Sequence, residues 1–173
     1  MEPLIILVGP TGVGKTDLAV DLALHFGAEI ISADSMQIYR GLDIGTAKPT
    51  IQERRGVPHH LIDVVPPDQP FTVVDYQEHF QTIKARLKTG GILPLLTGGT
   101  GLYIRAVTQG FVFPTTPPNP ELRAALRQEA QTHGRQAVYQ RLVELDPNAA
   151  QKIHPQDLKR TLRALEVRSE SVV

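Results

Sequence analysis

The sequence of 173 residues contains no cysteine and no long apolar run, and each absence excludes a class of protein. Without cysteine, neither a disulfide framework nor a cysteine zinc site can form, which suits the cytosol. The longest apolar runs, 4–8 and 92–96, are far too short to span a bilayer. Because the first residues also lack the basic and apolar regions of a signal peptide, we expect a soluble, cytoplasmic protein with no membrane partner.

The formal net charge is zero, but the two halves of the chain differ in sign. Residues 1–80 contain five Lys/Arg and eleven Asp/Glu, whereas residues 81–173 contain thirteen and seven. A basic half can bind a polyanion such as nucleic acid. Solvated helix faces would give the same excess, so both interpretations stay open on charge alone.

A glycine-rich pattern near the start of the chain predicts a phosphate-binding loop. It matches G-x-x-x-x-G-K-[ST] and directly follows the apolar run 4–8. Glycines let successive amide groups point inward, and the helix that follows adds partial positive charge. The loop consists of Gly9, Pro10, Thr11, Gly12, Val13, Gly14, Lys15 and Thr16. We expect Lys15 to bind outer phosphate oxygens and Thr16 to ligate Mg²⁺, and the alternative is a glycine-rich turn without a ligand.

Hydrophobic periodicity predicts an α/β fold for the first hundred residues. Predicted strands at 4–8, 29–33 and 92–96 alternate with helical patterns, one after the phosphate loop and one from Thr72 to about Lys88. This alternation is typical of a parallel sheet with helices on both faces. Proline 94 lies inside the third run, so we expect that strand to pair mainly after this residue.

The composition changes near residue 114, and all later signals are helical. Four prolines make the connection stiff: Pro114, Pro117, Pro118 and Pro120. Helix signals follow at 120–132, 135–145, from Asp146 onward and at 158–167. We therefore divide the chain into an α/β phosphate-loop core, residues 1–113, and a smaller all-helical unit, residues 114–173.

Polar residues also follow the second and third predicted strands, at the sheet edge where open α/β sheets bind ligands. Asp34 can act as a general base near a bound phosphate, and a helix N-cap or an outer magnesium shell is the alternative. Gly98–Gly101 repeats the strand–loop–helix geometry of an anion site, and a tight turn is the alternative. The adjacent pair His59 and His60 points to opposite faces of an extended segment, which disfavours a metal site.

Two elements typical of nucleoside triphosphatases are missing. The run 92–97 leads into Gly98 without the acidic residue of a Walker-B strand, and Asp63 is only a weak substitute. No Asn-Lys-x-Asp sequence occurs, which argues against a GTPase. ATP is the usual ligand of such a nucleotide-binding loop, but this loop is poorly equipped for ordinary triphosphate hydrolysis.

Several sequence blocks, in the right order, resemble the tRNA dimethylallyltransferases, also called tRNA isopentenyltransferases. The blocks are Gly9–Thr16, Ile31–Arg40, Asp43–Pro49, His59–Asp63, Gly98–Tyr103, Ile153–Pro155 and Arg163–Val167. The resemblance implies a transferase that moves a dimethylallyl group from dimethylallyl diphosphate to N6 of the adenosine just 3′ of the tRNA anticodon. Diphosphate would be released, and Mg²⁺ would be the cofactor.

The resemblance also implies roles for individual residues. Lys15, the loop amides and magnesium on Thr16 would stabilise the departing diphosphate, with Gly98 and Gly99 beside them. Asp34 would take the N6 proton, with Thr100 near the reacting centre, after the base leaves its stack. The implied contacts to the anticodon stem-loop are Asp34, Ser35, Met36, Gln37, Thr100, Arg123, Lys159, Arg160, Thr161, Leu162 and Arg163. We expect a monomer.

Members of this family continue well beyond the helix that ends near Val167, whereas this sequence ends at Val173. We therefore expect a truncated chain with uncovered core surface. Three alternatives remain: a prenyltransferase acting on free adenine nucleotides, an inactive remnant that still binds tRNA or diphosphate, and a small-molecule kinase. The basic helical segment favours RNA over a free nucleotide as the acceptor.

Overall fold

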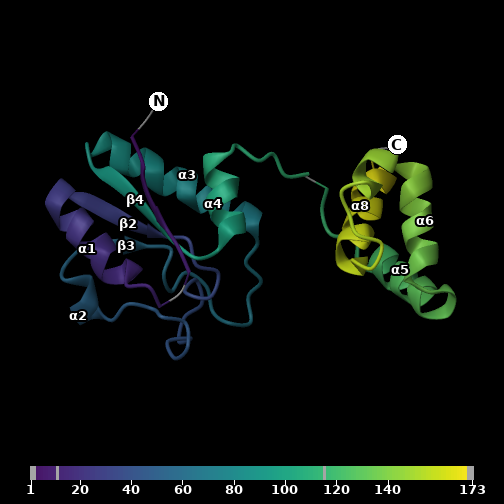
Figure 1. Ribbon diagram of the computed structural model, residues 1–173, viewed down its shortest axis with the longest axis horizontal. Helices are drawn as coiled ribbons and strands as arrows, with labels where there is room; N and C mark the ends of the chain where they lie inside the picture. The colour runs from purple at the N-terminus through teal and green to yellow at the C-terminus, as the bar shows by residue number, and fades with distance from the viewer. Residues whose placement is uncertain (1–2, 11, 115, 171–173) are drawn as a thin grey trace. The chain divides into compact units, whose positions relative to one another are not determined.

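The chain forms two compact units, Met1–Val112 and Phe113–Val173, in the computed structural model (Figure 1). The structure describes residues 3–10, 12–114 and 116–170. The boundary between the units lies one residue before the boundary predicted from composition. Thr11, which we assigned to the phosphate loop, lies outside the described residues.

The first unit is a parallel sheet of four strands, β1 (Ile5–Val8), β2 (Ala28–Ser32), β3 (His59–His60) and β4 (Leu93–Gly98). The strand order is β1-β4-β2-β3, so β4 lies between the first two strands of the chain. The helices of this unit are α1 (Lys15–Phe26), α2 (Ile51–Arg54), α3 (Val73–Thr89) and α4 (Gly101–Thr108). The predicted α/β fold with a parallel sheet is confirmed.

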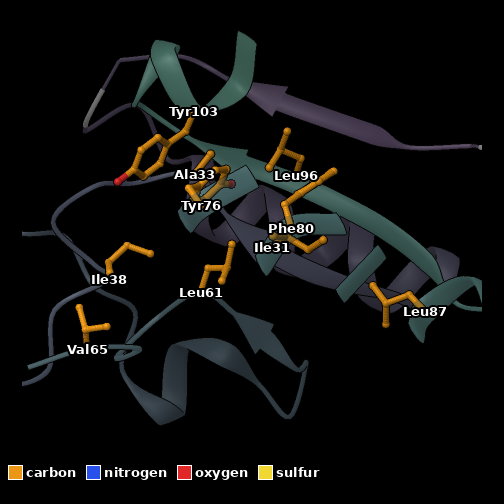
Figure 2. Packing of buried hydrophobic residues seen from close by; sticks show 10 residues of the cluster. All are labelled: Ile31, Ala33, Ile38, Leu61, Val65, Tyr76, Phe80, Leu87, Leu96 and Tyr103. Carbon is orange, nitrogen blue, oxygen red and sulfur yellow. The ribbon is translucent and has the colours of Figure 1, made fainter. Parts of the chain in front are cut away.

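Hydrophobic clusters cover both faces of the sheet, because neighbouring residues of a strand point to opposite sides. Ile30 of β2 and Leu95 of β4 pack with residues of α1 on one face. Ile31 and Leu96 pack on the other face with residues of α3 and α4 (Figure 2). Alternating burial of this kind fixes the register of the central strands, and therefore the positions of their carboxyl ends.

Local sequence signals define the ends of the helices. Thr72 and Asp75 form the predicted capping box at the start of α3, with each side chain bound to the backbone amide of the other. Gly27 ends α1 with φ 61°, a left-handed conformation that glycine adopts without a steric penalty. Strand β2 begins directly after this glycine, so the tight helix end sets where the second strand starts.

The prediction for Pro94 holds on one side of β4 only. Pairing with β1 begins at Leu95, after the proline. Pairing with β2, however, already includes Leu93 and Pro94. A proline lacks the amide donor but keeps its carbonyl acceptor, so it is tolerated in this ladder.

The second unit contains four helices, α5 (Pro120–His133), α6 (Arg135–Leu145), α7 (Pro147–Ala150) and α8 (Leu158–Glu170). Leu126, Val138, Leu142, Leu162 and Leu165 are among the buried residues of its core. Asn119 and Asp146 cap α5 and α7 through hydrogen bonds from Leu122 and Ala149. In the described part of the chain, every helix is too short or too polar to cross a membrane.

Candidate active site

Three segments meet in one cavity at the carboxyl edge of the sheet. The phosphate loop follows β1, Asp34 follows β2 and Gly98–Gly99 ends or follows β4. Because β4 lies between β1 and β2, these three ends are neighbours. The cavity has a volume of about 210 Å³, and its lining includes Gly12, Gly14, Lys15, Thr16, Asp34, Gln37, Ala47, Pro49, His59, Ile62, Gly98 and Gly99.

The phosphate loop has the backbone conformation of an anion site. Gly12 and Gly14 have φ values of 85° and 80°, which glycine adopts readily. Gly14 is the N-cap of α1, so the first amides of this helix have no side-chain cap and face the loop. The Lys15 ammonium donates to the Pro10 carbonyl. An anion in the cavity would offer this ammonium a charged acceptor instead of a neutral one.

Other residues predicted for the loop lie around this cavity rather than on its lining. Gly9 and Pro10 line a second hollow, which also includes Gly98 and Gly99. Val13 is exposed. The glycines at 98 and 99 thus line both spaces. Within the described residues, no three His, Asp or Glu side chains gather in a group that could hold a metal. A metal here would depend on the Thr16 hydroxyl and on ligands from a substrate.

Asp34 lies in the turn that follows β2, and Thr100 anchors this turn. The Asp34 carboxylate accepts a hydrogen bond from the Met36 amide at 2.9 Å and also lines the cavity. The Thr100 hydroxyl oxygen accepts from the Ser35 amide at 2.9 Å, and the Thr100 amide donates to the Ala33 carbonyl at 2.9 Å. Thr100 therefore fixes the position of Asp34, whereas Asp34 itself borders the space for a ligand.

Gly98 is required by the close approach of β2 and β4. A Cβ atom at this position would lie 2.3 Å from the Ala33 carbonyl oxygen, far inside van der Waals contact. A backbone atom cannot swing away as a side chain can. The glycine therefore lets the Asp34 turn reach the end of β4, a role for which its conformational freedom is not needed.

Replacing Gly98 with alanine should push the Ala33–Asp34 backbone away from β4. We expect a loss of about 1–3 kcal/mol in the free energy of unfolding, the usual cost of overpacking. Urea denaturation followed by circular dichroism measures this change. Gly101 is the matched control, because a Cβ atom there meets nothing within 4 Å. Equal stabilities of the two alanine variants would contradict the close-approach argument.

Gln37 uses its side-chain amide to hold a loop over the cavity. Its Nε2 donates to the carbonyls of Ala47 at 3.0 Å and Thr46 at 3.3 Å, and its Oε1 accepts from the Ser32 hydroxyl at 2.9 Å. Both amide protons are thus engaged within the chain. Among the predicted RNA contacts at positions 34–37, Met36 is the most exposed to solvent, with 48% of its surface accessible.

The two adjacent histidines face different surroundings, as predicted. The His59 ring lines the cavity and hydrogen bonds through Nδ1 to the Val57 carbonyl at 2.8 Å. Burial lowers the pKa of His59 below its usual value, and the nearby Arg54 adds to this effect. The neutral ring therefore predominates at pH 7. His60 instead contacts Glu29, with Nε2 2.6 Å from Oε2.

The sequence patterns did not predict the residues that form one wall of the cavity. Ala47, Pro49 and Ile62 come from loops, and His59 comes from a strand of only two residues. Ala47 has φ 50°, a conformation that no sequence pattern predicted. The only sequence signal for these residues was the family resemblance, whose Asp43–Pro49 and His59–Asp63 blocks contain them.

In the helical unit, two of the predicted RNA contacts are buried. Thr161 and Leu162 are 1% and 4% exposed, and the Thr161 hydroxyl donates to the Asp157 carbonyl at 2.9 Å. Their side chains pack inside the unit and expose little surface to a partner, so their contact with RNA stays a prediction. Lys159 and Arg160, two residues earlier in α8, are exposed.

Arg123 and Arg163 bind the buried carboxylate of Glu166. Arg123 donates through Nε at 2.8 Å and Nη2 at 2.7 Å, and Arg163 donates through Nη1 at 2.6 Å. The Asn119 amide adds a fourth bond at 2.6 Å. Burial acts to raise the pKa of Glu166, but these bonds outweigh it and lower the pKa to about 2. Both arginines therefore have an internal partner.

Comparison with known proteins gives one consistent family. Residues 37–172 match the family model for IPP transferase. The chain is 53% identical over 167 residues to the tRNA dimethylallyltransferase of Roseiflexus sp. (strain RS-1), which covers 96% of this chain and 55% of the relative. It is 52% identical to the enzyme of that name from Symbiobacterium thermophilum, over 99% of this chain and 54% of the relative.

Solved structures agree with the sequence comparison. The tRNA isopentenylpyrophosphate transferase of Bacillus halodurans is 45% identical, with a TM-score of 0.65 over 96% of this chain and 55% of that one. A eukaryotic dimethylallyltransferase acting on tRNA is 29% identical, with a TM-score of 0.83 over 99% of this chain and 44% of that one. The chain thus spans about half the length of these relatives. With a family model matching most of its residues, this chain belongs to the IPP transferase family.

Proposed function

We propose that the chain transfers a dimethylallyl group from dimethylallyl diphosphate to N6 of the adenosine just 3′ of the tRNA anticodon. The observation that carries this proposal is that the phosphate loop and Asp34 line the same cavity. An anion site beside a carboxylate suits a reaction in which an anionic group leaves while a proton is removed. The names of the relatives point to the same pair of substrates.

The phosphate loop and Asp34 would take separate parts in this reaction. The diphosphate would bind the amides at Gly12 and Gly14 and the Lys15 ammonium, which stabilise the negative charge that grows as the allylic C–O bond breaks. The bonding electron pair leaves with the diphosphate. The N6 lone pair then forms the new C–N bond, and the N6 proton passes to Asp34. Thr100 keeps the Asp34 turn in place through Ser35.

The cavity also fits the magnesium ion that this chemistry implies. Mg²⁺ is usually held by one or two protein oxygens, water molecules and substrate phosphates rather than by a cage of carboxylates. Thr16 lines the cavity next to Lys15, and its hydroxyl would supply such an oxygen. The ion would add positive charge against the departing diphosphate.

We assign the phosphate-loop core, residues 1–113, to the chemistry and the helical unit, residues 114–173, to tRNA binding. Lys159 and Arg160 support this division, because both are exposed cations on α8. Arg123 and Arg163 would contribute through the guanidinium groups that Glu166 holds in place. We place the reaction in the cytoplasm, with the protein acting as a monomer on the anticodon stem-loop.

Incubation with labelled dimethylallyl diphosphate, Mg²⁺ and either tRNA or AMP tests this function directly. We expect label in the tRNA, and none in a tRNA that carries guanosine in place of the adenosine next to the anticodon. Label in AMP alone would identify a nucleotide prenyltransferase instead. Binding of diphosphate without transfer to either acceptor would identify the chain as an inactive remnant.

A further inference from the structure

Lys48 is a charged side chain enclosed beside the candidate active site. Its side chain is 4% exposed. Its ammonium donates to the Tyr39 carbonyl at 2.9 Å, to Asp43 Oδ1 at 2.7 Å and to Asp63 Oδ1 at 2.7 Å. An ammonium has three protons, so each one has an acceptor in the chain.

The carboxylates keep this lysine charged. Burial acts to lower the pKa of Lys48, but the hydrogen bonds to Asp43 and Asp63 outweigh it and raise the pKa above the usual value. One charged group thereby joins the loop of residues 41–49 to the turn of residues 61–63. Removing it would leave two carboxylates facing each other without a cation.

The two segments that Lys48 joins also form one wall of the cavity. Ala47 and Pro49, on either side of Lys48, line the cavity, as does Ile62, which precedes Asp63. Ala47 and Asp63 have φ values of 50° and 57°. Residues other than glycine hold this conformation only when surrounding contacts fix it. The Lys48 bonds supply such contacts to both segments.

The part of this wall formed by Ala47, Pro49 and Ile62 shares its cavity with the phosphate loop. These three residues have aliphatic side chains, whereas Lys15 and Thr16 of the loop bring polar groups to the same space. A ligand held by its diphosphate at the loop would place an attached hydrocarbon group against the aliphatic part. The Lys48 ammonium itself lies behind the wall, bound to Asp43 and Asp63.

We propose that Lys48 is a positioning residue that shapes the prenyl-binding wall through Asp43 and Asp63. This inference rests on the proposed function, because it takes the ligand to be an allylic diphosphate. Lys48 does not touch the substrate. It instead holds Ala47, Pro49 and Ile62 in the arrangement that receives the hydrocarbon group, so its effect should depend on whether the ligand carries that group.

Affinities for two ligands test the inference in the 173-residue chain. Inorganic diphosphate reports on the phosphate loop alone, whereas dimethylallyl diphosphate reports on the loop and the wall. In the variant Lys48→Met we expect the affinity for dimethylallyl diphosphate to fall by about tenfold, the scale of a lost hydrocarbon contact. The affinity for inorganic diphosphate should stay within about twofold, because the Lys48 ammonium binds Tyr39, Asp43 and Asp63, which belong to segments other than the phosphate loop. Isothermal titration calorimetry with Mg²⁺ measures both.

Lys152→Met is the matched control, since Lys152 is an exposed lysine of the helical unit. It should leave both affinities unchanged. Asp43→Asn removes the negative charge of one Lys48 partner, a carboxylate that is 68% exposed, but keeps an acceptor oxygen. It should therefore give a smaller loss in the same direction. This milder variant carries the test if Lys48→Met does not fold.

The outcomes separate this inference from the proposed function. A wild-type preference for dimethylallyl diphosphate over inorganic diphosphate that persists unchanged in Lys48→Met and Asp43→Asn would overturn the role of Lys48 alone. Equal wild-type affinities for the two ligands would overturn the prenyl substrate, and the role of Lys48 with it. A loss of preference confined to the Lys48 and Asp43 variants would support both.

Discussion

Replacing Asp34 with asparagine should lower the rate of dimethylallyl transfer to tRNA by about 100- to 10,000-fold, the range expected for loss of a general base. The amide has the same shape as the carboxylate, and its oxygen can still accept the bond from the Met36 amide. It cannot accept the N6 proton that the proposed reaction removes. A single-turnover assay with labelled dimethylallyl diphosphate isolates this step from product release.

Substrate affinity distinguishes a lost base from a distorted site. We expect Asp34→Asn to bind dimethylallyl diphosphate within about twofold of wild type, because the phosphate loop is a separate segment. Asp68→Asn is the matched control, as Asp68 lies in an exposed turn outside the cavity lining. A transfer rate within about threefold of wild type would mean that Asp34 is not the base. Its carboxylate would then only stabilise the turn through the bond from the Met36 amide.

The sequence was sufficient to predict which polar segments meet in the candidate cavity. The phosphate loop, Asp34 and Gly98 each follow an apolar run, and parallel strands bring their carboxyl ends to one edge. Their meeting in one cavity needed only the strand periodicity and the parallel topology. The fixed conformations of Gly12 and Gly14 are also encoded locally, in the loop pattern itself.

The apolar half of the site could not be predicted in this way, because it is held by contacts between distant residues. Lys48 reaches Asp63 across fifteen positions, and His59 is in a strand only because it pairs with Ile30. Neither contact leaves a periodic signal.

The reason for the glycine at position 98 was also not visible in the sequence. A tight turn was the alternative to an anion site there, whereas the structure shows that a Cβ atom would clash with the Ala33 carbonyl oxygen.

Charge patterns on helices were likewise ambiguous without the structure. The sequence of α8 places cations at 159, 160 and 163, and a surface role fits the first two, which are exposed. Arg163 and the distant Arg123 instead form hydrogen bonds with Glu166. The family resemblance included Glu166, but no sequence pattern indicated a role for it. A buried anion between two arginines shows that a cation predicted to bind RNA can also serve the interior of its own unit.

Replacing Glu166 with glutamine should destabilise the helical unit by about 3 kcal/mol, near the lower end of the range for breaking a buried ion pair. The side chain is 0% exposed. Of its four short bonds, three join Asn119 and Arg123 at the start of α5 to α8, and the fourth holds Arg163 within α8. The pKa shift gives a similar figure: a change from 4.5 to about 2 corresponds to about 3 kcal/mol at 1.36 kcal/mol per unit. Chemical denaturation at pH 7 followed by circular dichroism measures the loss.

The pH dependence of this difference identifies its cause. Because the pKa of Glu166 is lowered by folding, the stabilisation is fully present above pH 4.5 and is lost as the pH falls toward 2. The stability gap between wild type and Glu166→Gln should therefore close over this range. Glu129→Gln, which breaks the partly exposed pair with Arg141, should cost under about 1 kcal/mol. A gap for Glu166→Gln that persists at pH 2 would attribute the loss to packing rather than to charge.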